Sequence, residues 1–314
     1  MPFAPKTQAF NAKINMVVLG TGDKAVAIGG NNVLPFYSFD APIENAPKIG
    51  VEITDIAPKE YVQPKLKAFY DGCGGVEEMA VRAQSIPGVS FLALHFKSAD
   101  PNGENRPVDE CAALAEAVAA KVELPLVIMG CKDIEKDAEL FGKIAEKLAG
   151  KNILVLSARE ENYKAVSASA ALAYGQKVGA ESAVDINLAK QLNAVMTQLG
   201  VNPGAIVMQA GSAAAGYGFE YLASTLDRIK AAGLAQADAQ LQMPVITPVS
   251  PETWDVKESI MPESEMPEWG DAEERGIEME IATASACLAA GSDAVIMRHP
   301  DAIGAISRMI DALV

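Results

Sequence analysis

The side chains that could do metal or nucleophilic chemistry stand far apart in this sequence. Its histidines are His95 and His299, and its four cysteines, Cys73, Cys111, Cys131 and Cys287, lie tens of residues from one another. Local zinc and iron–sulfur motifs need such ligands only a few residues apart. We therefore expect reduced, mostly buried thiols and no metal site built from neighbouring residues.

One candidate binding loop is rich in small residues. It runs from Gln209 to Gly218 as QAGSAAAGYG, and no Lys-Ser/Thr pair follows its glycines, so it is not a Walker phosphate loop. Small side chains leave backbone amides free and let a bulky planar group or another protein approach. The candidate contacts are Gln209, Gly211, Ser212, Ala213, Ala214 and Tyr217, with the hydroxyls of Thr247 and Ser250 as hydrogen-bonding groups. A flexible glycine loop without a ligand is the alternative.

A second candidate loop, Ser250 to Arg275, is long and acidic. It contains both tryptophans, Trp254 and Trp269. From Pro251 to Arg275 there are nine acidic and two basic residues, a local charge of −7 within a total of −15. Long loops are usually lids or binding surfaces, and exposed tryptophans favour protein contacts. We predict that Trp254 and Trp269 bind a partner protein. The alternative is that the segment is a solvent-exposed loop without a binding role.

These loops must be positioned by a regular framework, and the apolar pattern predicts one. Short apolar runs predict eight strands, at 49–54, 90–96, 125–130, 152–157, 178–184, 205–209, 244–248 and 293–298. Amphipathic patterns predict helices at 108–122, 134–148, 162–174, 187–199, 220–232, 274–290 and 302–313. Eight βα units in about 265 residues match an α/β fold of the (β/α)8 TIM-barrel type better than an open sheet of five or six strands.

In such barrels the loops that follow the strands form the working face. The polar residues there are His95, Ser98, Cys131, Lys132, Asp133, Ser157, Arg159, Asp185, Asn187, Gln209, Ser212, Thr247, Ser250, Arg298 and His299. His299 precedes Pro300 at a helix start, which favours a structural role over a proton shuttle. Asp185 is either a helix N-cap or a ligand contact.

The segment before the first barrel strand differs. Residues 16–19 and 25–28 are apolar runs joined by Gly20-Thr21-Gly22-Asp23, which predicts a β-hairpin. GTGDKA is a partial dinucleotide fingerprint, but no helix pattern opens on its glycines as that motif requires. We expect residues 1–47 to form an N-terminal extension whose hairpin plugs the bottom of a barrel spanning residues 48–314.

Composition limits the partners and the location. The chain has 314 residues, half of them hydrophobic, and 26 basic against 41 acidic side chains. Binding to phosphates needs Lys and Arg, so we expect neither nucleic acid nor anionic membrane surfaces as partners. No apolar run approaches the roughly 20 residues of a membrane-spanning helix, and residues 1–13 lack a secretory signal pattern. We expect a soluble, cytoplasmic protein.

Many short motifs resemble one family. They are Ser157-Ala158, Asn162-Tyr163-Lys164, Tyr174-Gly175, Val184 to Asn193, Gly216 to Tyr221, Trp254 with Lys257-Glu258, Trp269-Gly270, Arg275-Gly276 with Glu280, Thr283-Ala284, Gly291-Ser292-Asp293 and His299-Pro300. Their order and spacing resemble the small subunit of the corrinoid iron-sulfur protein, the delta subunit of archaeal acetyl-CoA decarbonylase/synthase. The likeness covers most of the chain after Lys48.

The resemblance implies a methyl carrier of the reductive acetyl-CoA pathway of anaerobes. In that family a larger subunit holds the corrinoid domain and a [4Fe-4S] cluster. The heterodimer takes a methyl group from methyltetrahydrofolate through a separate methyltransferase and delivers it to acetyl-CoA synthase. This chain would then be the barrel that caps the corrinoid (cobalamin) and docks these partners, without catalytic residues of its own. It lacks the Asp-x-His-x-x-Gly pattern that supplies a lower cobalt ligand in some corrinoid proteins.

The residues alone are also compatible with two other functions. A self-sufficient pterin-dependent methyltransferase is also a barrel, and Asp185, Asn187 and Gln209 could grip a pterin. A barrel aldolase or lyase needs a Schiff-base lysine or a metal, and Lys132 is the only nearby lysine, although it follows its strand.

Overall fold

Eight parallel strands form a closed barrel in the computed structural model, which describes residues 6–314; residues 1–5 of the predicted extension lie outside it. The strands are β3 (Lys48–Thr54), β4 (Val89–His95), β5 (Leu126–Met129), β6 (Leu154–Ala158), β7 (Lys177–Glu181), β8 (Ile206–Gln209), β9 (Ile246–Pro248) and β10 (Ala294–Met297). The sheet runs β8-β7-β6-β5-β4-β3-β10-β9, and a parallel bridge between Met208 and Val245 joins its two edges. The predicted (β/α)8 barrel is confirmed, with each strand within a few residues of its expected position.

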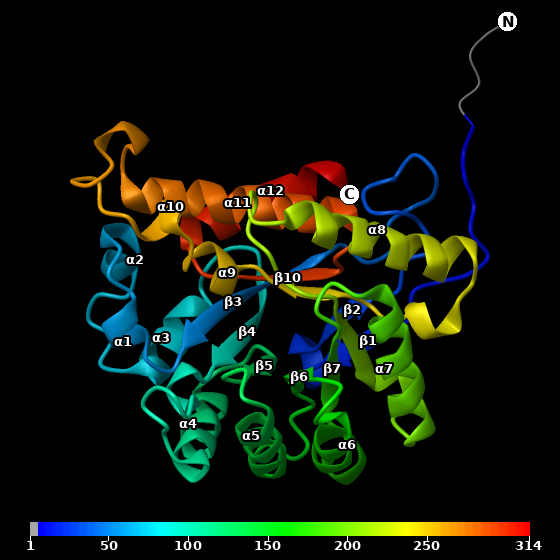
Figure 1. The fold of residues 1–314 in the computed structure, drawn as a ribbon, viewed down its shortest axis with the longest axis horizontal. Helices are drawn as coiled ribbons and strands as arrows, with labels where there is room; N and C mark the ends of the chain where they lie inside the picture. Colours follow the sequence, from blue (N-terminus) through cyan, green and yellow to red (C-terminus); the bar gives the residue numbers. More distant parts are fainter. Residues whose placement is uncertain (1–5) are drawn as a thin grey trace, which may run out of the picture.

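The strands are nearly all apolar because both of their faces are buried. Helices cover the outside (Figure 1). They include α4 (Val108–Lys121), α5 (Ile134–Lys147), α6 (Tyr163–Val166) continued by a π-helical turn (Ser167–Leu172), α7 (Ile186–Gln198), α8 (Phe219–Ala235), α11 (Ala272–Ala290) and α12 (Pro300–Leu313). Each corresponds to a predicted amphipathic pattern. Gly150 ends the turn after α5 with φ at 80°, a left-handed conformation that glycine adopts without strain.

The apolar pattern predicts no clear helix between the first two barrel strands, and the structure has three short ones. They are α1 (Ala57–Glu60), α2 (Pro64–Phe69) and α3 (Val76–Ala83). Pro58 and Pro64 each sit near a helix start, and glycines at positions 72, 74 and 75 precede α3. Helices of four to eight residues are too short to show a repeated apolar face, which is why the pattern missed them.

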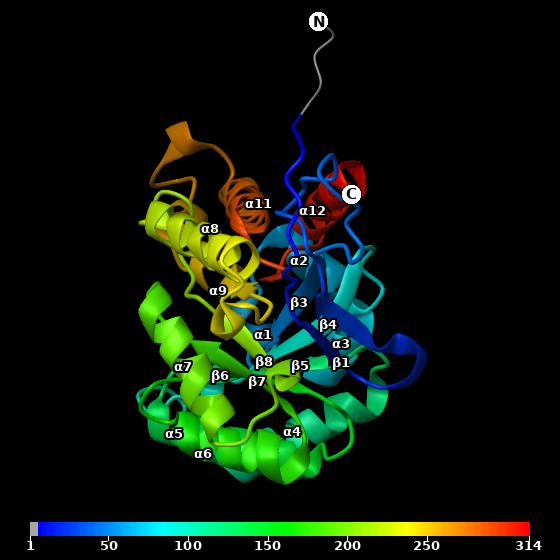
Figure 2. The ribbon, with the colours of Figure 1, turned by 90° about the vertical axis from the view of Figure 1, so that its right-hand side faces the viewer.

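The N-terminal hairpin is confirmed. Strands β1 (Met16–Leu19) and β2 (Val26–Gly29) pair antiparallel, and only a 3-10 turn (Gly22–Lys24) lies between them, so the glycines open no long helix. The hairpin lies at the N-terminal end of the barrel strands (Figure 2, dark blue). Its apolar side chains Val17, Leu19 and Ile28 are fully buried in one cluster with barrel-interior residues such as Phe91. The hairpin therefore fills the bottom of the barrel.

The segment 250–275 is more regular than the irregular loop we predicted. It contains α9 (Ser250–Thr253), α10 (Lys257–Ile260) and a 3-10 turn (Pro267–Trp269), and α11 already begins at Ala272. The prediction of a loop without regular structure was wrong because four-residue helices leave no periodic signal. Among the described residues, none of the helices combines the length and apolar character needed to cross a bilayer.

Candidate functional site

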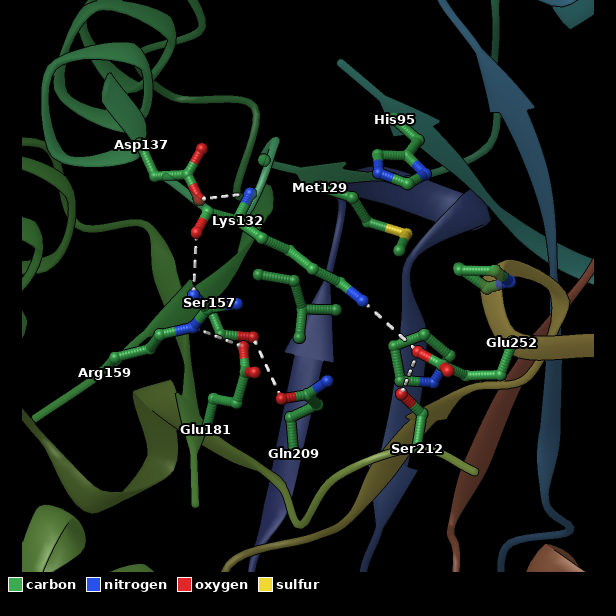
Figure 3. A pocket seen from close by; sticks show the side chains of 14 residues that line it. His95, Met129, Lys132, Asp137, Ser157, Arg159, Glu181, Gln209, Ser212 and Glu252 are labelled. Atoms are coloured by element: carbon green, nitrogen blue, oxygen red, sulfur yellow. Dashed lines mark hydrogen bonds and ion pairs between the residues drawn. The ribbon is translucent and has the colours of Figure 1, made fainter. Parts of the chain in front are cut away.

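A small cavity of about 30 Å³ opens at the C-terminal end of the barrel. Its lining comes from the ends of strands β4 to β9 and the loops that follow them (Figure 3). The labelled side chains are His95, Met129, Lys132, Asp137, Ser157, Arg159, Glu181, Gln209, Ser212 and Glu252. We call this cavity the mouth. The predicted working face of the barrel thus contains a polar cavity.

Three loops are joined across the mouth by Glu252. Its Oε1 lies 3.2 Å from the Lys132 ammonium nitrogen and accepts a hydrogen bond from Ser212 Oγ at 3.0 Å. Figure 3 shows Lys132 extended across the cavity toward this carboxylate. The loops after β5, β8 and β9 are therefore linked by one carboxylate.

A second ion pair lies on the other wall. Arg159 Nε is 3.1 Å from Glu181 Oε2, and Arg159 Nη1 donates to the Lys132 carbonyl oxygen at 2.9 Å. Ser157 Oγ lies 3.5 Å from Gln209 Oε1. Lys132 and Arg159 are each neutralised by a neighbouring carboxylate, so the mouth is polar without a net positive charge.

The Cys131 thiol beside the mouth is held by Asp137. The carboxylate accepts hydrogen bonds from the backbone N–H groups of Cys131 and Lys132 at 2.7 and 3.0 Å, and the thiol lies 3.3 Å from it. Burial and the Asp137 charge raise the pKa of Cys131 to about 12. The sulfur is therefore a protonated thiol at neutral pH, which is a poor nucleophile.

Behind the mouth, inside the barrel, three charged or ionisable side chains interlock. Glu52 from β3 is fully buried, and His95 and Arg298 are 6% and 3% exposed. Glu52 Oε1 lies 2.6 Å from His95 Nδ1, and Oε2 accepts from Arg298 Nε and Nη2 at 3.0 and 2.8 Å. Burial alone would raise the pKa of Glu52, but the Arg298 charge and the His95 hydrogen bond outweigh it and hold that pKa well below its usual range. Glu52 is ionised at neutral pH.

His299 has the structural role we favoured. Its Nδ1 accepts from the backbone N–H of Asp301 at 3.1 Å, which caps α12, and its ring stacks on Trp254 with centroids 5.8 Å apart. Burial lowers the pKa of His299.

Glu280 accepts hydrogen bonds from the backbone N–H groups of Arg298 and His299 at 2.6 and 3.0 Å, and burial raises its pKa to about 7.

The predicted loop residues divide into two groups. Gln209 and Ser212 line the mouth. Gly211 and Ala214 are buried inside the loop, Ala213 is partly exposed, and Tyr217 is 47% exposed. Tyr217 donates to Glu258 Oε2 at 2.6 Å, which ties this loop to the acidic segment.

Thr247 and Ser250 lie inside the fold rather than on the rim. Thr247 is 1% exposed, and its Oγ1 is 2.7 Å from Ser292 Oγ, outside the barrel wall and behind β10. Side chains alternate along a strand, so the outward position of Thr247 follows from the inward position of its neighbours Ile246 and Pro248. Ser250 is fully buried. Neither hydroxyl is placed to meet a group that docks on the mouth.

The two tryptophans have different environments. Trp254 is 2% exposed and packs on Gly276, where any Cβ would collide with the indole ring. A side chain buried in this way cannot contact a partner in this conformation, so Trp254 is a packing residue. Trp269 is partly exposed, and its ring lies 5.3 Å from Lys257 Nζ and 5.7 Å from the Arg275 guanidinium.

Several other strand-end residues have structural roles, as helix N-caps or in side-chain hydrogen bonds. Asp133 and Asp185 are the N-caps of α5 and α7. Buried Ser98 donates a hydrogen bond to Asp55.

Of the three side chains considered for binding a pterin, only Gln209 lines the mouth. Asp185 and Asn187 are exposed and lie outside it. Within residues 6–314, no three His, Cys, Asp or Glu side chains are grouped so that they could hold a metal ion.

Residues 16–302 match the family described as CO dehydrogenase/acetyl-CoA synthase delta subunit. The chain belongs to this family. The acetyl-CoA decarbonylase/synthase complex subunit delta of Archaeoglobus fulgidus is 31% identical over 99% of the chain and 71% of that protein. Subunit delta 1 of Methanosarcina thermophila is 32% identical over 94% of the chain and 67% of that protein. The resemblance seen in the sequence motifs is confirmed.

Solved structures support the barrel fold of this delta-subunit family member. A dihydropteroate synthase of Yersinia pestis aligns with a TM-score of 0.55 at 13% identity, covering 85% of this chain and 93% of that one. A dihydropteroate synthase of Coxiella burnetii aligns with a TM-score of 0.54 at 12% identity, covering 86% and 94%. At such identities the likeness shows the fold alone.

Sequence reasoning missed Glu52, Glu181 and Glu252. Glu181 falls inside the predicted strand 178–184 and Glu252 inside the predicted acidic loop, and neither has distinctive neighbours in the sequence. Glu52 carried a usable signal, because it is the one acidic residue in the apolar run KIGVEIT. A charge in a strand buried on both faces requires a partner, and Arg298 in this delta-subunit chain is that partner.

Proposed function

We propose that this chain is the small subunit of a corrinoid iron-sulfur methyl carrier in the acetyl-CoA pathway. The C-terminal face of its barrel caps the corrinoid held by a large subunit. The same face docks the partners between which the methyl group moves, methyltetrahydrofolate methyltransferase and acetyl-CoA synthase. The chain contributes shape and hydrogen bonds and has no catalytic activity alone.

Family membership is the observation that carries this proposal. The curated relatives are named subunits of an acetyl-CoA decarbonylase/synthase complex, and the match spans nearly the whole chain. A subunit of such a complex needs an exposed face on which other subunits can sit. The mouth, with the loops around it, is the natural candidate because ligands of barrels of this type bind at the C-terminal ends of the strands.

The residues at the mouth suit a large planar group that lies across it. The cavity of about 30 Å³ is too small for a whole corrin ring, so the ring would rest on the rim. The Gly211–Gly218 loop offers a low rim, since Ala213 and Ala215 are partly exposed and a Cβ built at Gly216 would meet nothing within 4 Å. Gln209 and Ser212 add hydrogen-bonding groups. We retain these loop residues, with Tyr217, as the contacts, and drop Thr247 and Ser250.

The division of chemistry between subunits follows the same proposal. A bound corrinoid supplies the cobalt that accepts and donates methyl groups. We place the [4Fe-4S] cluster on the large subunit, because the four cysteines here lie on separate elements: Cys73 before α3, Cys111 on α4, Cys131 after β5 and Cys287 on α11. In this chain the mouth residues bind the corrinoid rim, orient it and exclude water.

The acidic segment is the proposed contact for partner proteins. Trp269 with Lys257 and Arg275 forms a partly exposed cluster on it, and nearby Ile260 is 59% exposed. Aromatic and apolar side chains rimmed by charges are typical of protein interfaces. A hydrogen bond from Tyr217 to Glu258 joins this segment to the loop that follows β8.

Binding to the large subunit tests the proposal. The purified chain should bind a corrinoid-loaded large subunit about tenfold more tightly than the corrinoid-free large subunit, as measured by isothermal titration calorimetry. The isolated chain should not transfer methyl groups from methyltetrahydrofolate to free cobalamin. Equal affinity for the two forms of the large subunit, or rapid methylation of free cobalamin by the chain alone, would overturn the proposal.

A further inference from the structure

His95 is a buried side chain that borders the open space of the mouth. Its ring is 6% exposed. It nevertheless lines both the mouth and a neighbouring cavity of about 160 Å³, which is also bounded by Lys97, Cys131 and Asp255. The ring thus borders both cavities.

The contacts of His95 fix which of its nitrogens is free. Nδ1 lies 2.6 Å from Glu52 Oε1, and Glu52 is kept ionised by Arg298 at its other oxygen. A carboxylate can only accept a hydrogen bond, so Nδ1 carries the proton and donates it. In the neutral imidazole, Nε2 then has a lone pair and acts as an acceptor. The same carboxylate–histidine arrangement orients histidines in many binding sites.

The charges around the mouth select against an anion. Lys132 and Arg159 are paired with Glu252 and Glu181 at 3.2 and 3.1 Å. A carboxylate entering here would meet the lone pair of His95 and the charge of Glu252. A neutral primary amide fits better, because its N–H2 group can donate to His95 Nε2 while its carbonyl accepts from Lys132 or Gln209. Such an amide is also an uncharged group, which avoids the cost of burying a charge.

We propose that His95 Nε2 accepts a hydrogen bond from a carboxamide arm at the rim of the corrin ring. This rests on the proposed function, in which a corrinoid lies over the mouth. The corrin rim carries several such amide arms, and an arm pointing down from the ring is the part small enough to enter. His95 is then the residue that distinguishes an amide-bearing corrinoid from one whose arms are carboxylates.

The sequence makes a direct test possible, since the chain has only two histidines. In the ¹⁵N-histidine-labelled chain, the His95 Nε2 resonance should shift on addition of the large subunit loaded with methylcobinamide, which is diamagnetic. The corrinoid-free large subunit should leave it in place. His299, whose ring is 1% exposed, serves as the internal reference.

Affinity supplies the second measurement. The wild-type chain should bind the large subunit loaded with methylcobinamide about 3- to 10-fold more tightly than the same subunit loaded with methylcobyrinic acid, the range for one net hydrogen bond. H95F, which lacks an acceptor, should lose this preference, and H95Q, which restores one, should recover part of it.

The outcomes separate the two proposals. A corrinoid-dependent gain in affinity with an unmoved His95 resonance, or with an amide preference that persists in H95F, would overturn the role of His95 and leave the capping function standing. Equal affinity for loaded and corrinoid-free large subunits would overturn the capping function itself. If H95F does not fold, the wild-type resonance decides.

Discussion

Arg298 donates two hydrogen bonds to one oxygen of Glu52, from Nε at 3.0 Å and from Nη2 at 2.8 Å. The two residues are 246 positions apart in the sequence. Glu52 lies on β3, and Arg298 directly follows β10, the strand that pairs with β3 in the barrel. Since their side chains are 0% and 3% exposed, water screens this ion pair very little. The geometry of the mouth depends on it, because Glu52 also orients His95.

Breaking this pair should destabilise the fold strongly. R298M removes the guanidinium that pairs with the buried Glu52 charge and leaves only the His95 hydrogen bond, so we expect the free energy of unfolding in urea to fall by about 3–5 kcal/mol. The double variant E52Q/R298M should lose less than the sum of the single variants, because it leaves no unpaired charge. R308M, at an exposed position of α12, is the matched control and should change stability by less than about 0.5 kcal/mol. Equal effects of R298M and R308M would contradict the prediction.

The barrel could be predicted because its strands are recognisable in the sequence as short apolar runs. A parallel strand that is covered on both faces must be an unbroken apolar run. The strands Leu126–Met129 and Ala294–Met297 contain only apolar residues. The long helices likewise carried a periodic apolar face. The short helices α1, α9 and α10 could not be predicted in this way, since four residues are about one helical turn and cannot display a period.

The candidate site was predictable in position but not in pairing. Among the polar residues predicted at the strand ends, His95, Lys132, Ser157, Arg159, Gln209 and Ser212 line the cavity, whereas others such as Asp185, Asn187 and Thr247 do not. Their partners Glu52, Glu181 and Glu252 come from other strands and loops, and no local pattern links them. The burial of Trp254 is not predictable from the loop sequence, because Gly276, which makes room for its ring, lies just outside the predicted loop 250–275.

Glu280 should give the stability of the protein a pH dependence. Its pKa is raised from 4.5 to about 7 by burial, so the folded state holds a proton that the unfolded state has released. The contribution of this proton is complete below about pH 4.5 and is lost as the pH rises to about 7, which lowers the free energy of unfolding by about 3 kcal/mol over that interval.

Denaturant titrations between pH 5 and 8 check this expectation. The E280Q variant has no carboxyl to titrate there, so its stability should vary less with pH than that of the wild type. E278Q, on the exposed side of the same helix, should keep the wild-type slope. A slope that is the same in E280Q and the wild type would show that Glu280 does not titrate in this range.

The hairpin should contribute to barrel stability through one face only. Leu19 is fully buried in the cluster at the bottom of the barrel, whereas its neighbour Val18 is 36% exposed. L19A should lower the free energy of unfolding by about 2–5 kcal/mol, the range for a buried leucine that leaves a cavity. V18A should cost less than about 1 kcal/mol. Urea unfolding followed by circular dichroism measures both, and a hairpin that merely rests on the barrel would give two similar, small losses.

The two tryptophans should separate stability from partner binding. A deletion of the whole acidic segment is a poor test, since it would also remove Trp254 from the core. W254A should lower the free energy of unfolding by about 3–5 kcal/mol because the indole fills the space between Gly276 and His299.

W269A should leave the urea midpoint nearly unchanged. It should weaken binding to the corrinoid-loaded large subunit, methyltransferase or acetyl-CoA synthase by about tenfold or more, as expected for an aromatic interface residue. Calorimetric titration of W269A against each partner identifies which of them uses this surface. Unchanged affinity for all three would remove the acidic segment from the proposed docking face.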